Sequence, residues 1–145
     1  MQYAALILGL IAATLPTNAS AQAARAAFQD NYADVNGVRL HYASVGSGPL
    51  VLFLHGYPSF WYQWKDQMAE MGRDHLAVGL DMRGHNLSSR PEGLEPYKMN
   101  HLVEDVRQFA EKIGGKGKRF ILVAHDWGPT SHGPSRCFTR RCWRN

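Results

Sequence analysis

Cysteine is nearly absent from this 145-residue chain, and both copies, Cys137 and Cys142, lie within the last ten residues. A pair at this spacing supplies two of the four ligands that a structural zinc site needs, so we expect no metal site. The residues before position 130 contain no cysteine at all, which suits an oxidising compartment.

Excess charge is also absent once the tail is set aside. The chain has 16 Lys and Arg against 12 Asp and Glu. Four of the arginines crowd into the last ten residues, namely Arg136, Arg140, Arg141 and Arg144, so that 12 basic residues balance 12 acidic ones in the remainder. The neutral body argues against nucleic acid as a partner.

A long apolar run is lacking as well. The run from Ala4 to Leu15 is shorter than the roughly 20 residues that span a bilayer. Pro16 ends it, and the small residues of 19–23 suit cleavage by a signal peptidase. We expect residues 1–23 to be an export signal of a secreted or periplasmic protein without a stable membrane anchor. The alternatives are an uncleaved N-terminal anchor or an apolar helix.

Three apolar runs read as strands. Leu50–Leu54, His75–Leu80 and Arg119–Ala124 are short and nearly continuous, as expected of strands buried on both faces. Before them, residues 22–30 read as a linker, and Asn36-Gly37 predicts a turn that leads into an alternating strand from Val38 to Ser44.

Two segments between these runs have apolar residues at helical spacing. One covers residues 60–71, with Ser59 as an expected N-cap and Gly72 after its end. The other covers residues 99–113. Strands and helices in alternation predict an α/β fold with a mostly parallel sheet and flanking helices. Because the carboxyl ends of such strands share one edge, His55, Asp81 and Asp126 are the first candidates for chemistry.

The segment Ala124–Gly128, A-H-D-W-G, has small residues two positions before and two positions after Asp126. A sharp turn from strand to helix requires them, because its strained backbone leaves no room for side chains there. The apex residue here is Asp126, whereas serine is the commonest apex residue of such turns. Aspartate is a carboxylate at neutral pH, so it can attack carbon directly and form an ester that water then cleaves with a histidine base. The alternative role for Asp126 is an ordinary helix N-cap.

A second motif, H-G-Y-P at His55–Pro58, follows the apolar run at 50–54. A turn of this kind can direct a backbone N–H at a developing anion. The N–H groups of Tyr57 and Trp127 would then form the pair of donors that an oxyanion hole needs. His55 and His125 belong to these two motifs, and we expect them to hold loops rather than transfer protons.

Four stretches together resemble the N-terminal part of the α/β-hydrolase superfamily, and specifically its epoxide-hydrolase-like branch: His55–Trp64, Asp81–Pro91, Tyr97–Val106 and Leu122–Gly128. The resemblance covers about residues 31–128. It implies an α/β-hydrolase fold that is truncated after the nucleophile elbow, which is the strand-to-helix turn at Ala124–Gly128.

The same resemblance implies the chemistry. Asp126 would be the nucleophile, and Tyr57 and Trp127 would supply the oxyanion-hole N–H groups. The substrate would be a small epoxide, opened to a diol without metal or organic cofactor. His85 stands where the family often has Tyr. A haloalkane or haloacid dehalogenase of the same fold, acting on a halogenated compound, is the alternative, although Tyr57 replaces the Asn that its halide site often has.

The tail at residues 129–145 does not resemble the family. Its prolines, Pro129 and Pro134, are incompatible with the helix that should follow the elbow. We interpret this tail as the product of a frameshift or truncation. His132 lies only six residues after Asp126, so it cannot replace a base from late in the fold. We therefore expect this chain to be a fragment of an enzyme that does not turn over its substrate. The alternative is an inactive, non-catalytic fragment.

Overall fold

The computed structural model describes residues 28–126. The predicted export signal at 1–23, the tail at 129–145 and Trp127 lie outside these residues. No helix in this part of the chain combines the length and the hydropathy that crossing a membrane requires.

A five-stranded sheet organises the described residues, with the strands in the order β1-β2-β4-β3-β5. The bounds are β1 Gln29–Val35, β2 Val38–Val45, β3 Leu50–Leu54, β4 Leu76–Leu80 and β5 Ile121–Ala124. β4, β3 and β5 are parallel, whereas β1 and β2 form an antiparallel extension beside β4. The mostly parallel sheet predicted from the sequence is confirmed.

The antiparallel extension is a hairpin around the predicted Asn36-Gly37 turn. Both turn residues have positive φ, 46° and 74°, which is the conformation that Asn-Gly favours between twisted strands. The first strand of this hairpin, β1, begins at Gln29, inside the segment that we interpreted as a linker. That interpretation is wrong at its end, because pairing with β2 supplies the order that the polar sequence of β1 does not indicate.

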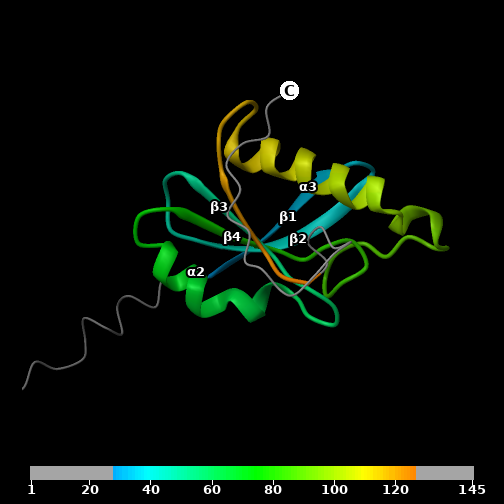
Figure 1. The fold of residues 1–145 in the computed structure, drawn as a ribbon, viewed down its shortest axis with the longest axis horizontal. Helices are drawn as coiled ribbons and strands as arrows, with labels where there is room; N and C mark the ends of the chain where they lie inside the picture. The colour runs from blue at the N-terminus through cyan, green and yellow to red at the C-terminus, as the bar shows by residue number, and fades with distance from the viewer. Residues whose placement is uncertain (1–27, 127–145) are drawn as a thin grey trace, which may run out of the picture.

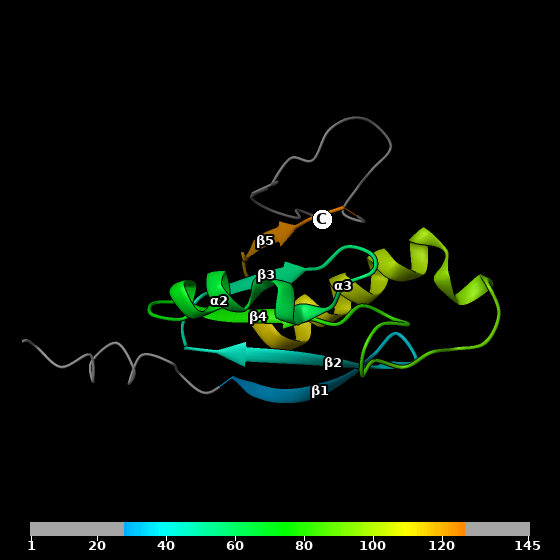
Figure 2. The same cartoon turned by 90° about the horizontal axis from the view of Figure 1, so that it is seen from below.

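Two helices cover opposite faces of the sheet. α3, Met99–Gly114, lies on one face, and α2, Lys65–Met71, lies on the other (Figures 1 and 2). β3 packs against both layers. Leu50, Leu52 and Leu54 join the cluster that contains Phe109 of α3. Val51 and Phe53 join the cluster that contains Met68 of α2. This is why all five residues of β3 are buried and why its sequence shows no polar alternation.

The start of the first helical segment differs from the prediction. A 3₁₀ turn, η1, spans Trp61–Trp64 before α2 begins. Its N-cap is Phe60, with no side-chain cap, so the expected capping by Ser59 is wrong. A distant side chain replaces the local cap, because the N–H of Trp61 donates to Oδ1 of Asp81 over 2.8 Å. A second 3₁₀ turn, η2, covers Glu95–Tyr97 just before α3.

Candidate active site

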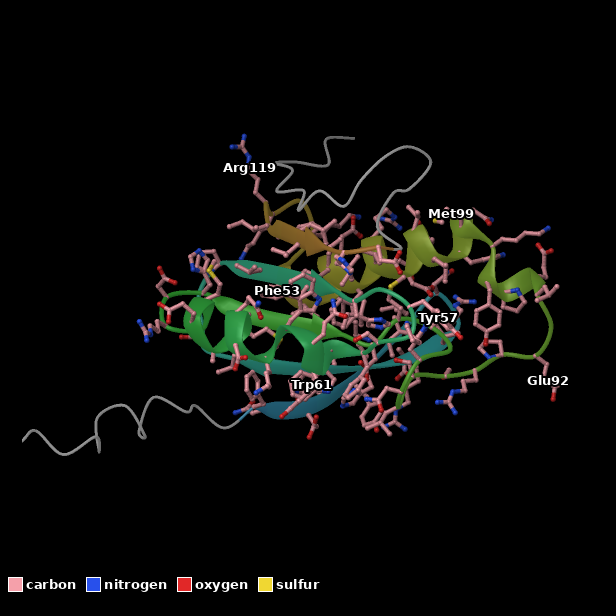
Figure 3. The ribbon with its side chains drawn as sticks, turned by 60° about the horizontal axis from the view of Figure 1, so that its bottom comes forward. Phe53, Tyr57, Trp61, Glu92, Met99 and Arg119 are labelled. Carbon is pink, nitrogen blue, oxygen red and sulfur yellow. The ribbon has the colours of Figure 1, made fainter. Side chains whose placement is uncertain are left out.

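The register of the parallel strands brings the candidate residues to one edge. Leu54 at the end of β3 pairs with Leu80 of β4 on one side and with Ala124 of β5 on the other. The residues that follow these three positions therefore leave the sheet together, which is where ligand sites of such sheets form. Figure 3 shows Tyr57 beyond the end of the strand that carries Phe53.

Asp126 stands at the tip of the turn after β5. Its φ is 61°, a left-handed conformation that costs a non-glycine residue of the order of 1–2 kcal/mol. The residue is exposed, and its Oδ2 accepts a hydrogen bond of 3.0 Å from the N–H of Tyr57. The strained turn and the amide donor predicted from the two motifs thus lie next to each other, although their catalytic roles stay predictions.

Gly56 makes this approach possible. A Cβ atom at this position would lie 2.5 Å from Cβ of Asp126 and 2.9 Å from its Oδ2. Both distances are shorter than real carbon and oxygen contacts, so any side chain here would push the two turns apart. Glycine at position 56 is therefore required by close packing of the two turns.

His55 holds the turn from beneath. Its ring is 1% exposed, and Nδ1 lies 2.9 Å from the carbonyl oxygen of Gly56. Nε2 accepts a 3.0 Å hydrogen bond from the N–H of Met82, so Nδ1 carries the proton and donates to Gly56. Burial lowers the pKa of His55, because a charged ring would lose its hydration. This agrees with the expected role of His55 in holding a loop.

Asp81 is not available for chemistry, in contrast to its place among the first candidates. The side chain is completely buried. Oδ1 accepts the N–H of Trp61, and Oδ2 lies 2.7 Å from Nδ1 of His41 and 2.6 Å from Nδ2 of Asn86. Because neighbouring groups occupy both oxygens, Asp81 faces the protein interior rather than the open edge of the sheet.

Two buried groups with structural roles were missed from the sequence. His41 of β2 is fully buried and lies between Asp81 and Asp30, whose Oδ1 is 3.1 Å from its Nε2. Arg83 donates two hydrogen bonds to Asp105 of α3, at 2.8 Å and 2.6 Å. The pair of Arg83 and Asp105 left a signal in the sequence, because Asp105 falls on the same helical face as Leu102 and Phe109. A charged residue on an apolar stripe indicates a buried ion pair.

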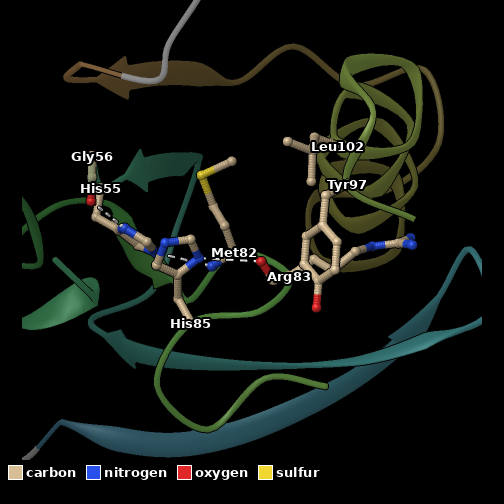
Figure 4. Close-up of a pocket in the computed structure, with 7 residues that line it drawn as sticks. All are labelled: His55, Gly56, Met82, Arg83, His85, Tyr97 and Leu102. Carbon is tan, nitrogen blue, oxygen red and sulfur yellow. Dashed lines mark hydrogen bonds between the residues drawn. The ribbon is translucent and has the colours of Figure 1, made fainter. Parts of the chain in front are cut away.

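A small pocket lies beside the H-G-Y-P turn, which contributes His55 and Gly56 to its lining (Figure 4). It has a volume of about 80 Å³ and is lined by His55, Gly56, Met82, Arg83, His85, Tyr97 and Leu102. This is well below the roughly 300–1,000 Å³ of typical ligand pockets. Asp126 is not among the lining residues, so the pocket is not by itself the space in which a substrate would meet the carboxylate.

His85 reaches the pocket from the loop after β4. Its ring lies edge-on to that of His55, with 4.8 Å between the centroids, and its Nδ1 is 3.1 Å from the carbonyl oxygen of Arg83. The ring of Tyr57 is 6.3 Å away. The departure at position 85 therefore places a second imidazole directly beside the H-G-Y-P turn.

This geometry limits the chemistry that the edge can perform. Asp126 is an exposed carboxylate on a strained turn. In the part of the chain that the structure describes, the hydrogen bond to its side chain comes from the N–H of Tyr57 to Oδ2, so Oδ1 could attack an electrophilic carbon. The same amide would face the oxygen on which negative charge develops when water attacks an ester formed there. Within residues 28–126, no group of three or more His, Cys, Asp or Glu is arranged to hold a metal ion.

The parallel sheet, its two helical layers and the Asp-bearing turn after β5 are the features of an α/β hydrolase. The chain belongs to the family described as alpha/beta hydrolase fold, whose model matches residues 49–130.

Curated relatives and solved structures narrow the resemblance. The chain is 41% identical over 99 residues to epoxide hydrolase 2 of Caenorhabditis elegans, a match that covers 67% of this chain and 27% of the relative. A crystal structure of an epoxide hydrolase from Vigna radiata superposes with a TM-score of 0.66 at 39% identity, over 70% of this chain and 31% of that one. A variant of an epoxide hydrolase from Bacillus megaterium gives a TM-score of 0.65 at 51% identity, over 68% and 34%.

These similarities support the epoxide-hydrolase-like branch and do not favour the dehalogenase alternative. The chain spans only about a quarter to a third of the length of these proteins.

Proposed function

We propose that this chain carries the nucleophile and one oxyanion donor of an epoxide hydrolase. The observation that carries the proposal is the 3.0 Å hydrogen bond from the N–H of Tyr57 to Oδ2 of a strained, exposed Asp126. The similarity to epoxide hydrolases supports the choice of substrate class.

In the first step, Oδ1 of Asp126 attacks an epoxide carbon. The carbon–oxygen bond of the ring breaks, and the ring oxygen takes a proton from solvent water to become a hydroxyl group. The product is a hydroxyalkyl ester on Asp126. Tyr57 would aim the carboxylate by holding Oδ2, so that Oδ1 points at the substrate.

In the second step, water adds to the carbonyl carbon of this ester. Negative charge develops on the oxygen that faces the N–H of Tyr57, and we propose that Trp127 supplies the second donor. Collapse of the intermediate releases a diol and restores the carboxylate. This step needs a base, and His132 is the one histidine that follows Asp126 in the sequence, six residues later.

We therefore propose that the chain as given forms the ester and does not turn over. The test is incubation of the full chain with styrene oxide, followed by intact mass and peptide mapping. The expected result is one adduct per chain on Asp126 and none on an Asp126→Asn variant. Labelling that survives in this variant would contradict Asp126 as the nucleophile, and many diols per chain would contradict the proposal that the chain does not turn over.

We also propose that residues 1–23 direct export. Expression in an exporting host and mass spectrometry of the mature N-terminus test this, because cleavage after the small residues of 19–23 would remove Met1. A secreted or periplasmic product that keeps Met1 would contradict a cleaved signal.

A further inference from the structure

We propose that Asp81 is a positioning residue for the reaction. Together with the backbone of Met82, it fixes the turn of residues 55–61 against Asp126. This inference rests on the proposed function, and it gives Asp81 a different role from the direct chemical one that its place at a strand end indicated.

Two hydrogen bonds anchor the turn at its two ends, and both come from consecutive residues after β4. The N–H of Met82 donates to Nε2 of His55, the first residue of the turn, over 3.0 Å. Oδ1 of Asp81 accepts the N–H of Trp61, the last residue of the turn, over 2.8 Å. Tyr57 lies between these anchors, so the position of its N–H depends on both.

Asp81 is itself held rigidly. His41 from β2 and Asn86 from the following loop both contact Oδ2, and the hydroxyl of Ser88 donates to the backbone oxygen of Asp81 over 2.6 Å. The side chain is fully buried. A carboxylate fixed from two elements can transmit their position to the N–H of Trp61, and a shift of about 1 Å near reacting atoms can lower a rate roughly 100-fold.

Asp105 provides a matched control in the same part of the fold. It is also buried, at 3% exposed, and its hydrogen-bond partners among the described residues are Arg83 and Asn36. Neither partner belongs to the turn. Truncating Asp105 therefore removes a buried, hydrogen-bonded carboxylate without removing an anchor of the turn.

The experiment measures the rate of adduct formation on Asp126 of the full chain against styrene oxide concentration. We expect Asp81→Ala to lower the limiting rate by at least about tenfold. The half-saturating concentration should change by less than about threefold, because the turn aims the nucleophile and does not bind the substrate. Asp81→Asn should restore most of the rate, since the amide oxygen can still accept the N–H of Trp61. Asp105→Ala should leave the rate per folded chain unchanged.

If Asp81→Ala does not fold, Asn86→Ala replaces it, because it removes one contact of Oδ2 and should give a smaller loss in the same direction. A limiting rate equal to that of the parent chain in the folded Asp81 variant, or in the Asn86 variant, would overturn the positioning role. So would a rate loss in Asp105→Ala as large as that in Asp81→Ala.

Amide hydrogen exchange separates this inference from the proposed function. Asp81→Ala, or Asn86→Ala in its place, should speed exchange at Tyr57 and Trp61 more than Asp105→Ala does. If the parent chain gives no adduct but exchange follows this pattern, the proposed reaction fails and the anchoring of the turn holds. Equal exchange in the variants would contradict the anchoring, whatever the chemistry.

Discussion

The backbone N–H of Tyr57 and the carboxylate of Asp126 are joined by a 3.0 Å hydrogen bond, although the two residues are 69 positions apart in the chain. The parallel pairing of β3 and β5 brings them together, because the two strands end side by side at Leu54 and Ala124. The contact links the two sequence motifs that carried the functional hypothesis.

Replacing Gly56 by alanine should separate the two turns. The new Cβ would lie 2.5 Å from Cβ of Asp126, so the hydrogen bond from Tyr57 must lengthen or break. We expect adduct formation with styrene oxide to slow by about 10- to 100-fold. Gly93→Ala is the control, because Gly93 has a positive φ but no atom within 4 Å of an added Cβ. It should lower stability slightly and leave the labelling rate intact, and equal rates in both variants would contradict the steric argument.

The left-handed conformation of Asp126 should lower the stability of the fold. At a φ of 61°, glycine is free of the strain that any side chain with a Cβ incurs. Asp126→Gly and Asp126→Ala both remove the carboxylate, but the glycine variant should be more stable than the alanine variant by about 1 kcal/mol. Urea denaturation measures the difference. Neither variant should form the adduct, and an alanine variant as stable as the glycine variant would show that the turn is not strained.

The stability of the fold should fall at acidic pH through His55. Burial lowers the pKa of its imidazole below the ordinary value of 6.5, and the hydrogen bond from Met82 requires an unprotonated Nε2. Between this lowered pKa and pH 6.5, the unfolded chain therefore binds a proton that the folded chain does not. The contribution of His55 is complete above that pH and is lost as the pH falls through the lowered pKa.

His55→Gln tests this, since glutamine can offer an acceptor to Met82 without titrating. Free energies of unfolding from urea titrations at about pH 4 to about pH 8 should fall less steeply in the variant than in the parent chain, where one extra proton contributes up to about 1.4 kcal/mol per pH unit. Parallel curves would mean that His55 does not carry this dependence.

Arg83 and Asp105 should be strongly coupled. Both are at most 5% exposed and share two short hydrogen bonds, so removing one partner leaves a buried charge without compensation. We expect Arg83→Met to lower the free energy of unfolding by about 3–5 kcal/mol. The double variant with Asp105→Leu should be less destabilised than this single variant. A double-mutant cycle by urea denaturation measures the coupling, and additive effects would exclude it.

The 3₁₀ turn η1, just before α2, shows why some local details could not be predicted from the sequence. Ser59 has the chemistry of an N-cap and the right position, yet the first N–H of η1 bonds to Asp81 instead. Capping preferences describe what a side chain can do locally. A carboxylate 20 residues away in the sequence supplies the same acceptor here, and only the folded sheet brings it into reach.

The order of the strands and of the two α-helices from β2 to β5 could be predicted from residues alone, whereas β1 could not. The continuous apolar run of β3 indicates a strand that is buried on both faces, and the 3.6-residue apolar stripe of α3 indicates a helix with one buried face. Both signals depend mainly on the local pattern of apolar residues. The Asn36-Gly37 turn and the small residues around Asp126 likewise reflect backbone geometry that few residues adopt. These features determined the fold class and the candidate nucleophile.

Tertiary structure alone decided which polar residues face the open edge and which turn inward. Asp81 and Asp126 both follow parallel strands, and nothing in the sequence around Asp81 indicates that its side chain turns inward. The difference arises from their neighbours, because His41, Asn86 and Trp61 surround Asp81, whereas the left-handed turn holds Asp126 out beside Tyr57. Hydrogen bonds between distant segments set that outcome, and they exist only once the strands have paired.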